Sequence, residues 1–559
     1  MSDIRRSILW VIFAFSLILL WDAWQVHNGK PAIFFPRPSD KPAVTAPAAT
    51  QPAAAQPGGA APAAAAEAEP AIARQTHVVS TDVLKLSFDS EGGTLIGADL
   101  LKHRSVGKDT PVQLLLQDGE HYYVAQTGLV GSSALPNHKV PMRLVGAARD
   151  LAEGQDSVSL RFESAPVGGV VLAKTYTLKR GAYDIAVRHE VINQGAAPVS
   201  PSLYLQLVRD NRQAGSDVPF ASTFTGPAFY SDAAKFEKVK FEDIDKDKAS
   251  FHKSASDGYV AMVQHYFASA WLLDAGVARE NYAEKVPGGN LYRAGFKTAL
   301  GEIAPGQSKA LDARLFVGPQ EEKVLERLAP GLELVKDYGW TTIVAKPLYW
   351  LLEKIHGFVG NWGWSIVLLV VVIKAAFYWL NANAYRSMAK MKAVNPRIQE
   401  MRERLKDKPQ LMQQEMMKLY REEKVNPLGG CLPILIQIPV FIALYSVLLA
   451  SVEMRNAPWL GWITDLSVKD PLFILPVVLT LTTVVQTALN PLPPDPMQAK
   501  MMWIMPLVFS VMFFSFPAGL VLYWITNNTL TVLQQAHINR RMGVPLKITL
   551  PTELFKKAK

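Results

Sequence analysis

The chain has 559 residues, of which 49% are hydrophobic and 19% are charged, and its formal net charge is +9. This composition excludes a chain that is disordered throughout. The single cysteine, Cys431, cannot form an internal disulfide bond, so a disulfide-stapled secreted domain is excluded as well. The excess of basic residues indicates an acidic partner, and the positions of those residues decide whether it is nucleic acid, anionic lipid or the ribosome.

Residues 1–24 are predicted to form an uncleaved transmembrane anchor. Arg5 and Arg6 precede an uncharged run from Ser7 to Trp21, and no small-residue cleavage site follows that run. The two arginines favour a cytoplasmic N-terminus. The next segment, residues 25–76, is rich in Ala and Pro. It has too few large apolar side chains to form a core, so we expect a linker.

Residues 77–330 are predicted to form a large periplasmic β-sandwich. Short stretches of alternating apolar and polar residues, such as Val83 to Phe88 and Tyr183 to Val191, are separated by Gly, Asn, Asp and Pro. Its histidines are scattered, and no metal-ligand spacing, GxSxG motif or Gly-rich phosphate loop is present. We expect a binding or spacing module here. Residues 331–357 mix aromatic and charged side chains, which predicts an amphipathic helix on the outer membrane surface.

Apolar runs in the rest of the chain predict five further transmembrane helices. The last run, from Met501 to about Gln535, would form a helix of about 52 Å, too long for a hydrocarbon core of about 30 Å, so we divide it at Phe516-Pro-Ala-Gly519. The predicted segments are a span at 358–380, a cytoplasmic helical hairpin at 381–428, a span at 430–452, a periplasmic loop at 453–470, a span at 471–490, a cytoplasmic loop at 491–500, spans at 501–516 and 519–537, and a basic cytoplasmic tail at 538–559.

The predicted fold is therefore a polytopic α-helical membrane protein with a large periplasmic β-sandwich. Six transmembrane helices place both termini in the cytoplasm, and five of the helices form the core. The basic tail and the basic hairpin then lie on the cytoplasmic side, which agrees with the usual distribution of Lys and Arg around membrane spans.

One charged side chain, Lys374, lies within the apolar runs of the five C-terminal spans. A charge in lipid costs at least about 2.5 kcal/mol, so such a residue marks a cavity or snorkels to the membrane surface. Gln437, Gln486, Asn527 and Asn528 lie in the cytoplasmic halves of other spans. Their shared depth predicts a hydrophilic groove that is open to the cytoplasm and closed toward the periplasm. The alternative is a set of separate hydrogen bonds between helices.

The cytoplasmic hairpin carries a methionine-rich stripe. Its residues recur at helical spacing on two helices joined by a turn at Asp407-Lys-Pro409. They are Tyr385, Met388, Met391, Met401, Met412 and Met416. Methionine adapts to varied apolar partners, so the stripe is predicted to receive substrate. Packing of the hairpin on itself is an equally weighted alternative.

The absence of acidic residues from these apolar runs argues against proton- or sodium-coupled transport. Lys374 would instead attract an acidic group entering from the cytoplasm, which favours a helper for inserting hydrophobic chains. No covalent chemistry, cofactor or metal is expected. Two rivals remain: a transporter or channel, and a periplasmic binding module with a merely structural membrane base.

Several motifs together resemble one family. They are Tyr385-Arg-Ser-Met-Ala-Lys-Met391, Arg402-Glu-Arg-Leu405, Glu423-Lys-Val-Asn-Pro-Leu-Gly-Gly-Cys431, Gln437-Ile-Pro439 and Phe516-Pro-Ala-Gly-Leu-Val-Leu-Tyr523. The chain resembles the YidC/Oxa/Alb membrane protein insertases, in the Gram-negative form with a large periplasmic domain. The resemblance implies a bacterial inner-membrane insertase and chaperone that is not an enzyme. It also implies nascent membrane proteins, the Sec translocon with its accessory subunits, the ribosome and the lipid bilayer as partners.

The resemblance also implies roles for individual residues. Lys374 matches the positive residue of the family's groove, which is often arginine, so this chain keeps the charge without the planar guanidinium. Tyr523 and Trp524 fall where the family places aromatic residues that meet substrate, although both rings could simply pack. Val370 stands where some relatives have a hydroxyl. The predicted substrate groove comprises Lys374, Gln437, Gln486, Tyr523, Trp524, Asn527 and Asn528. The basic tail is expected to meet either ribosomal RNA or anionic lipid.

Overall fold

The computed structural model of the protein describes residues 74–543, apart from gaps at 107, 132–134, 148, 213–222, 406–407, 424–431 and 491–495. The predicted anchor at 1–24, the linker up to residue 73 and the tail from residue 544 onward lie outside the described residues. The described residues from Thr76 onward belong to one compact unit.

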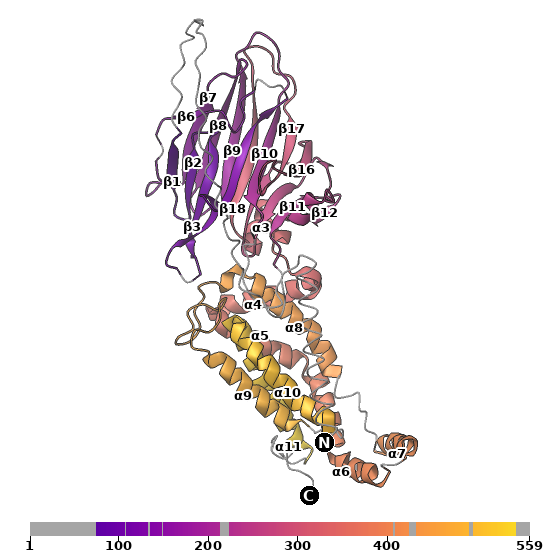
Figure 1. The fold of residues 1–559 in the computed structure, drawn as a ribbon. Helices are drawn as coiled ribbons and strands as arrows, with labels where there is room; N and C mark the ends of the chain where they lie inside the picture. The colour runs from indigo at the N-terminus through magenta and orange to yellow at the C-terminus, as the bar shows by residue number, and fades with distance from the viewer. Residues whose placement is uncertain are drawn as a thin grey trace, which may run out of the picture. The chain divides into compact units, whose positions relative to one another are not determined.

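Residues 76–319 form a β-sandwich of two nine-stranded antiparallel sheets (Figure 1), which confirms the predicted sandwich. The first sheet has the order β1-β2-β3-β4-β5-β10-β17-β16-β13 and the second has the order β12-β11-β14-β15-β18-β9-β8-β7-β6. The strands of the first sheet are β1 (Thr76–Ser80), β2 (Leu84–Asp89), β3 (Thr94–Arg104), β4 (Pro111–Gln117), β5 (Tyr122–Val130), β10 (Ser202–Asp210), β17 (Leu291–Ala299), β16 (Arg279–Lys285) and β13 (Ser254–Ala255). Those of the second are β12 (Lys235–Lys238), β11 (Gly226–Ser231), β14 (Tyr259–Val263), β15 (Phe267–Leu272), β18 (Ser308–Pro319), β9 (Asp184–Asn193), β8 (Val170–Lys179), β7 (Ser157–Ser164) and β6 (Met142–Val145).

The sandwich closes over a core of large apolar side chains. Alternation along β9 buries every second residue from Ile185 to Asn193, as expected for a strand with one face toward the core. Trp271, Tyr259, Tyr292 and Phe88 are among the largest fully buried side chains. A short helix, α2 (Phe241–Asp245), interrupts the strands.

A lysine also lies inside this core. Lys174 of β8 is fully buried, and its Nζ donates to Gly92 O at 2.6 Å and to Thr127 O of β5 at 2.7 Å. These bonds link the two sheets. Because the charged form loses its water, burial lowers the pKa of Lys174 to about 7.

The remaining elements are helical. They are α3 (Glu322–Leu328), η1 (Leu332–Val335), η2 (Gly339–Thr341), α4 (Thr342–Val359), α5 (Trp362–Ala376), α6 (Tyr378–Arg404), α7 (Pro409–Glu422), α8 (Leu432–Ala450), η4 (Val452–Met454), α9 (Ile474–Leu489), α10 (Pro496–Met512), η5 (Phe513–Ser515) and α11 (Ala518–Arg541). Asn361 caps α5 by accepting from Trp364 N at 3.1 Å.

The helix expected across 358–380 is not continuous. It ends at Ala376, and α6 starts at Tyr378 with a bend of 69° between the two helices. The first helix of the hairpin therefore begins before residue 381. No single helix among the described residues is long and apolar enough to cross a membrane, and the bent pair Trp362–Ala376 with Tyr378–Met388 reaches that length and composition only when its two helices are taken together. The count of six transmembrane helices stays a prediction.

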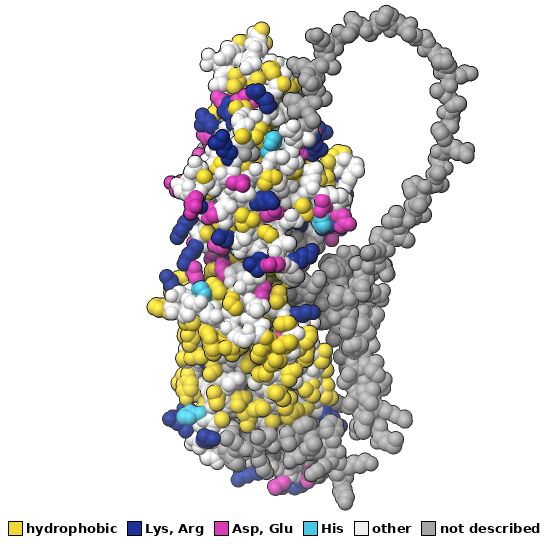
Figure 2. Space-filling model, turned by 90° about the vertical axis from the view of Figure 1, so that its left-hand side faces the viewer, with side chains coloured by type: hydrophobic (Ala, Val, Ile, Leu, Met, Phe, Trp, Pro, Cys, Tyr) yellow, Lys and Arg dark blue, Asp and Glu magenta, His cyan; other side chains and the backbone are white. Residues whose placement is uncertain are grey.

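Hydrophobic side chains cover the helical part on the face shown in Figure 2, and charged side chains concentrate over the β-sandwich. Exposed large hydrophobic residues on these helices include Trp379, Leu481, Val508, Val511 and Leu533. Surfaces that face water seldom expose apolar patches of this breadth, so the helical part is suited to an apolar environment.

We predict that Lys174 makes the stability of the sandwich depend on pH. The folded state gives up the Lys174 proton near pH 7, whereas the unfolded chain keeps it to about pH 10.4. The free energy of unfolding should therefore rise from pH 7 to 10, with a slope of at most about 1.4 kcal/mol per pH unit.

Urea unfolding of the detergent-solubilised chain at several pH values measures this slope. The rise should vanish in Lys174→Met and persist in Lys85→Met, which removes an exposed lysine of β2. If wild type and Lys174→Met differ by the same amount at every pH, the folded domain holds Lys174 protonated and the prediction is wrong.

Candidate functional site

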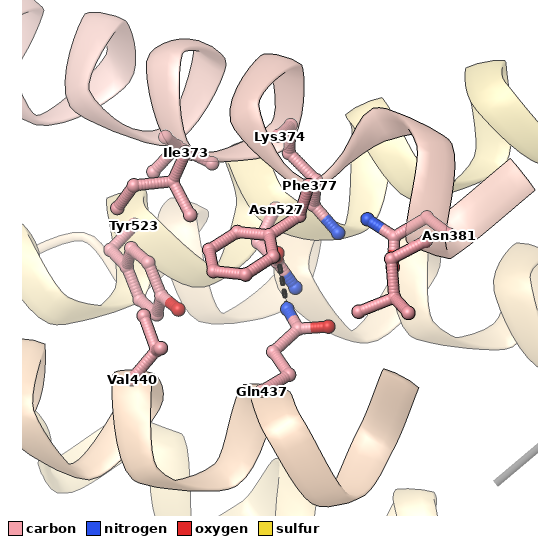
Figure 3. Close-up of a pocket in the computed structure, with 10 residues that line it drawn as sticks. Ile373, Lys374, Phe377, Asn381, Gln437, Val440, Tyr523 and Asn527 are labelled. Carbon is pink, nitrogen blue, oxygen red and sulfur yellow. Dashed lines mark hydrogen bonds between the residues drawn. The ribbon is translucent and has the colours of Figure 1, made fainter. Parts of the chain in front are cut away.

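A small pocket lies where α5, the start of α6, α8 and α11 meet (Figure 3). Its volume is about 30 Å³, which accommodates one or two water molecules. Apolar and polar side chains share its lining: Val370, Ile373, Lys374, Phe377, Leu380, Asn381, Gln437, Val440, Tyr523 and Asn527. Four of the seven predicted groove residues are therefore brought together here: Lys374, Gln437, Tyr523 and Asn527.

Lys374 reaches the pocket from the last turn of α5. Its Nζ donates to Thr531 Oγ1 of α11 at 2.8 Å, and the Thr531 hydroxyl donates to Asn527 O at 2.7 Å. Among the described residues, no carboxylate pairs with Lys374. An ammonium group has three protons, so this contact leaves two of them for another acceptor.

Amide side chains form the polar part of the lining. Gln437 Nε2 of α8 donates to Asn527 Oδ1 of α11 at 2.7 Å, which joins the two helices across the pocket (Figure 3). Asn381 of α6 lies beside Lys374 in the same view. Because three helices place amides around one cation, the pocket offers both donors and acceptors to a polar group that enters it.

Asn528 and Gln486 do not line the pocket. Asn528 is buried, and its Nδ2 donates to Thr483 Oγ1 of α9 at 3.0 Å. This contact is a hydrogen bond between helices, the alternative that the sequence left open. Successive residues of a helix point about 100° apart, and here Asn527 faces the pocket while Asn528 faces α9.

The two adjacent aromatic residues of α11 also differ. Tyr523 lines the pocket, and its ring lies 6.0 Å from the ring of Phe441 of α8. Trp524 instead packs edge-on against Phe441 at 4.5 Å and Phe513 at 4.6 Å. Tyr523 is 4% exposed and Trp524 is half-buried, so the packing alternative describes both rings, and Tyr523 in addition lines the pocket.

The hairpin helices α6 and α7 pack on each other through part of the methionine stripe. Met391 and Met416 contact a small cluster around Val394 and Ile398, together with Leu419 and Tyr420. The other predicted stripe residues, which are half-buried, are Tyr385, Met388, Met401 and Met412. Met391 and Met416 of the stripe therefore pack within the hairpin, while the other four residues leave part of their apolar surface exposed.

Thr531 and Asn381 are two residues of this site that were not predicted from the sequence. Thr531 follows Asn527 by four residues, so both lie on one face of α11, and this spacing could have revealed it. Asn381 was assigned to the hairpin, whereas the structure places it in the first turn of α6, just after the bend, where it lines the pocket with Lys374. Within the described part of the chain, no three His, Cys, Asp or Glu side chains are grouped to hold a metal ion.

Comparison with known proteins gives consistent matches. The family model described as the YidC periplasmic domain matches residues 76–351, and the one described as the 60Kd inner membrane protein matches residues 354–544. The membrane protein insertase YidC of Burkholderia orbicola is 54% identical over 549 residues, covering 97% of this chain and 99% of the relative. That of Cupriavidus taiwanensis is 54% identical over 555 residues, covering 97% and 98%. A crystal structure of an active YidC insertase is 19% identical and covers 82% of this chain and 91% of that chain, with a TM-score of 0.37.

We predict that Asn528 contributes to stability. Asn528→Ala removes the bond to Thr483, so the free energy of unfolding should fall by about 0.6 to 1.7 kcal/mol, the range found for hydrogen bonds between membrane helices. Unfolding in mixed detergent micelles measures this change. Thr529→Ala, on the exposed side of α11, is the matched control and should change stability less. Equal effects of the two substitutions would show that the Asn528 contact contributes nothing specific.

Proposed function

This chain belongs to the YidC family of membrane protein insertases, and we propose that the pocket around Lys374 receives the chain that is being inserted. Family membership rests on the two family models and on 54% identity over nearly the whole length of its relatives. The protein is an inner-membrane insertase with a periplasmic β-sandwich domain. It acts on nascent membrane proteins in the bilayer and is not an enzyme. The transporter and binding-module alternatives are therefore set aside.

One observation supports the proposed role of Lys374: its ammonium group lines the pocket with a hydroxyl, rather than a carboxylate, as its described partner. A cation in a poorly solvated site attracts an anion more strongly than it would in water. An acidic residue of an incoming chain would supply the missing negative charge. Lys374 in this proposal binds such a residue transiently and carries out no covalent chemistry.

The pocket must widen to admit a polypeptide, because about 30 Å³ holds no more than one or two waters. The hydrogen bond between Gln437 and Asn527 holds α8 against α11 across the pocket. Exchange of this bond for bonds to water or substrate would separate the two helices and hydrate the groove. Tyr523 and Val440 would then offer apolar contacts to the entering chain.

The finer topology and the further partners belong to the same proposal. We infer six transmembrane helices, cytoplasmic termini and a groove that opens to the cytoplasm. The half-buried methionines of the hairpin would make the first contact with apolar substrate segments. Insertion alone or with the Sec translocon is inferred from the family, and the basic tail would approach the ribosome or anionic lipid.

The experiment that tests the proposed pocket compares Lys374→Arg, Lys374→Ala and Lys374→Glu in cells depleted of their own insertase. The client is a short membrane protein with an acidic translocated tail, and protease protection measures insertion. Lys374→Arg should insert it within about twofold of wild type, because the positive charge remains. Lys374→Ala should reduce insertion severalfold and Lys374→Glu more, since glutamate repels the acidic tail.

Each variant must be present in the membrane in an equal amount. Lys354→Ala, which removes an exposed lysine of α4, is the matched control and should insert normally. Normal insertion by Lys374→Ala would contradict charge attraction and leave hydration and apolar contact to drive the insertion of that client.

A shortened chain ending at Arg541 tests the role of the tail. If the tail meets ribosomal RNA, removal of its remaining basic residues should weaken co-sedimentation with ribosomes and reduce the salt dependence of binding. Unchanged co-sedimentation, with weaker binding to vesicles that contain anionic lipid, would assign the tail to the membrane surface instead.

A further inference from the structure

The end of α8 that lies away from the pocket is held by a buried ion pair. Glu453 belongs to η4, the turn that follows α8. Both of its carboxylate oxygens lie 3.3 Å from Lys336 Nζ in the connector between η1 and η2. The side chain of Lys336 is 0% exposed and that of Glu453 is 17% exposed. Because neither charge is well solvated, each one depends on the other.

Tyr349 of α4 completes this cluster. Its hydroxyl donates to Glu453 Oε1 at 2.5 Å, and Lys336 Nζ lies 3.8 Å from the centre of its ring. Burial and the Glu453 charge raise the pKa of Tyr349, so the hydroxyl keeps its proton and remains a donor. One carboxylate therefore joins three segments: the connector after the sandwich, helix α4 and the end of α8. We call Lys336, Tyr349 and Glu453 the anchor cluster.

The sandwich adds contacts beside the anchor cluster. His265 Nε2 donates to Leu449 O, a carbonyl of the last turn of α8, at 2.9 Å. Burial lowers the pKa of His265 to about 4, so this donor is the neutral ring. Arg455 donates to Arg104 O at 2.7 Å, and its guanidinium lies 5.0 Å from the centre of the Tyr266 ring. The segment that follows α8 is thus fastened to the base of the sandwich.

Helix α8 connects the anchor cluster to the pocket. At the pocket, Phe441 contacts Tyr523 and Trp524 of α11. Pro439 is the proline inside α8, and it separates Gln437 from the segment that runs to the anchored end of the helix. That proline-free segment begins at Val440, which lines the pocket. Val440 lies next to Tyr523 of α11 in the pocket lining (Figure 3), so the position of this segment bears on the spacing of α8 and α11 there.

We propose that Glu453 is a positioning residue for insertion. With Lys336 and Tyr349 it fixes the end of α8, and thereby sets the distance between the α8 and α11 walls of the pocket. This inference rests on the proposed function of the pocket, but it assigns a role to a cluster that lies outside the pocket. Glu453 contacts no substrate in this scheme and acts through the position of α8.

The test measures the geometry of the pocket separately from insertion. In a Cys431→Ser background, the paired substitutions Gln437→Cys and Asn527→Cys report the spacing of α8 and α11 through their rate of disulfide formation. Lys336→Met and Glu453→Gln should each slow this reaction at least threefold, and Tyr349→Phe should slow it less. In chains that retain Gln437 and Asn527, Lys336→Met and Glu453→Gln should reduce insertion of the acidic client severalfold.

Lys323→Met is the matched control. Lys323 pairs with Glu353 of α4 at 2.6 Å, so its loss removes an ion pair to the same helix without touching η4. The control should change neither disulfide formation nor insertion. Equal slowing by Lys323→Met would attribute the effect to α4 alone and overturn the proposal.

The double variant Lys336→Met/Glu453→Met separates positioning from simple stability. Removing both charges relieves the unpaired charge that each single substitution leaves, so the thermal midpoint should recover. Disulfide formation and insertion should remain impaired if the pair positions α8. The proposal would be overturned if disulfide formation and insertion recovered in the double variant along with the thermal midpoint. It would also be overturned if Lys336→Met formed the disulfide and inserted the client at wild-type rates. If the wild-type chain itself fails to insert the client, the proposed function fails, while the disulfide rates still test the anchor cluster.

Discussion

Removing a lysine ammonium group from water costs several kcal/mol unless its protons find acceptors, and this cost shapes the structure at three places. Lys174 in the sandwich donates to two backbone carbonyls. Lys336 at the base of the sandwich faces a carboxylate and an aromatic ring. Lys374 in the pocket donates to one hydroxyl. The three sites differ in how much negative charge the protein itself provides.

That difference separates the two lysines that join segments of the chain from Lys374, which we propose attracts substrate. Lys174 and Lys336 have fixed partners on other segments of the chain, so their bonds join those segments. Lys374 has a neutral partner that is itself held by a backbone carbonyl of α11. Its position is thereby set while its charge is left uncompensated. A site of this kind attracts anions without selecting a particular geometry, which suits an insertase that must handle many different chains.

Features that follow from composition and from the spacing of apolar residues could be predicted from the sequence. The direction in which a helical side chain points could not. Alternating apolar residues predicted the sandwich, and one lysine in an apolar run led to the pocket. The sequence shows how far along a predicted membrane helix a residue lies, but not which neighbouring helix its side chain faces. Asn527 and Asn528 lie at the same depth in α11, yet Asn527 lines the pocket and Asn528 binds α9. The same holds for Tyr523 and Trp524.

Two further features had no usable signal in the sequence. The bend at Phe377 occurs without a proline or glycine at the break, so the apolar pattern predicted one continuous helix. Lys336 and Glu453 are separated by 117 residues, and they meet only in the tertiary structure. Charged residues near a predicted membrane surface are common, and their pairing depends on tertiary structure rather than on local pattern.

The bend between α5 and α6 has a mechanical consequence. Lys374 lies three residues before Phe377, and the hairpin extends from the other side of that residue. A force along α6, such as a pull from a chain bound to the hairpin, would therefore have a component across α5 and would act at Phe377, within one helical turn of the cation. A straight helix would carry the same load along its axis and leave the cation in place. Because Phe377 itself lines the pocket, movement of the hairpin about this bend would change the shape of the pocket wall.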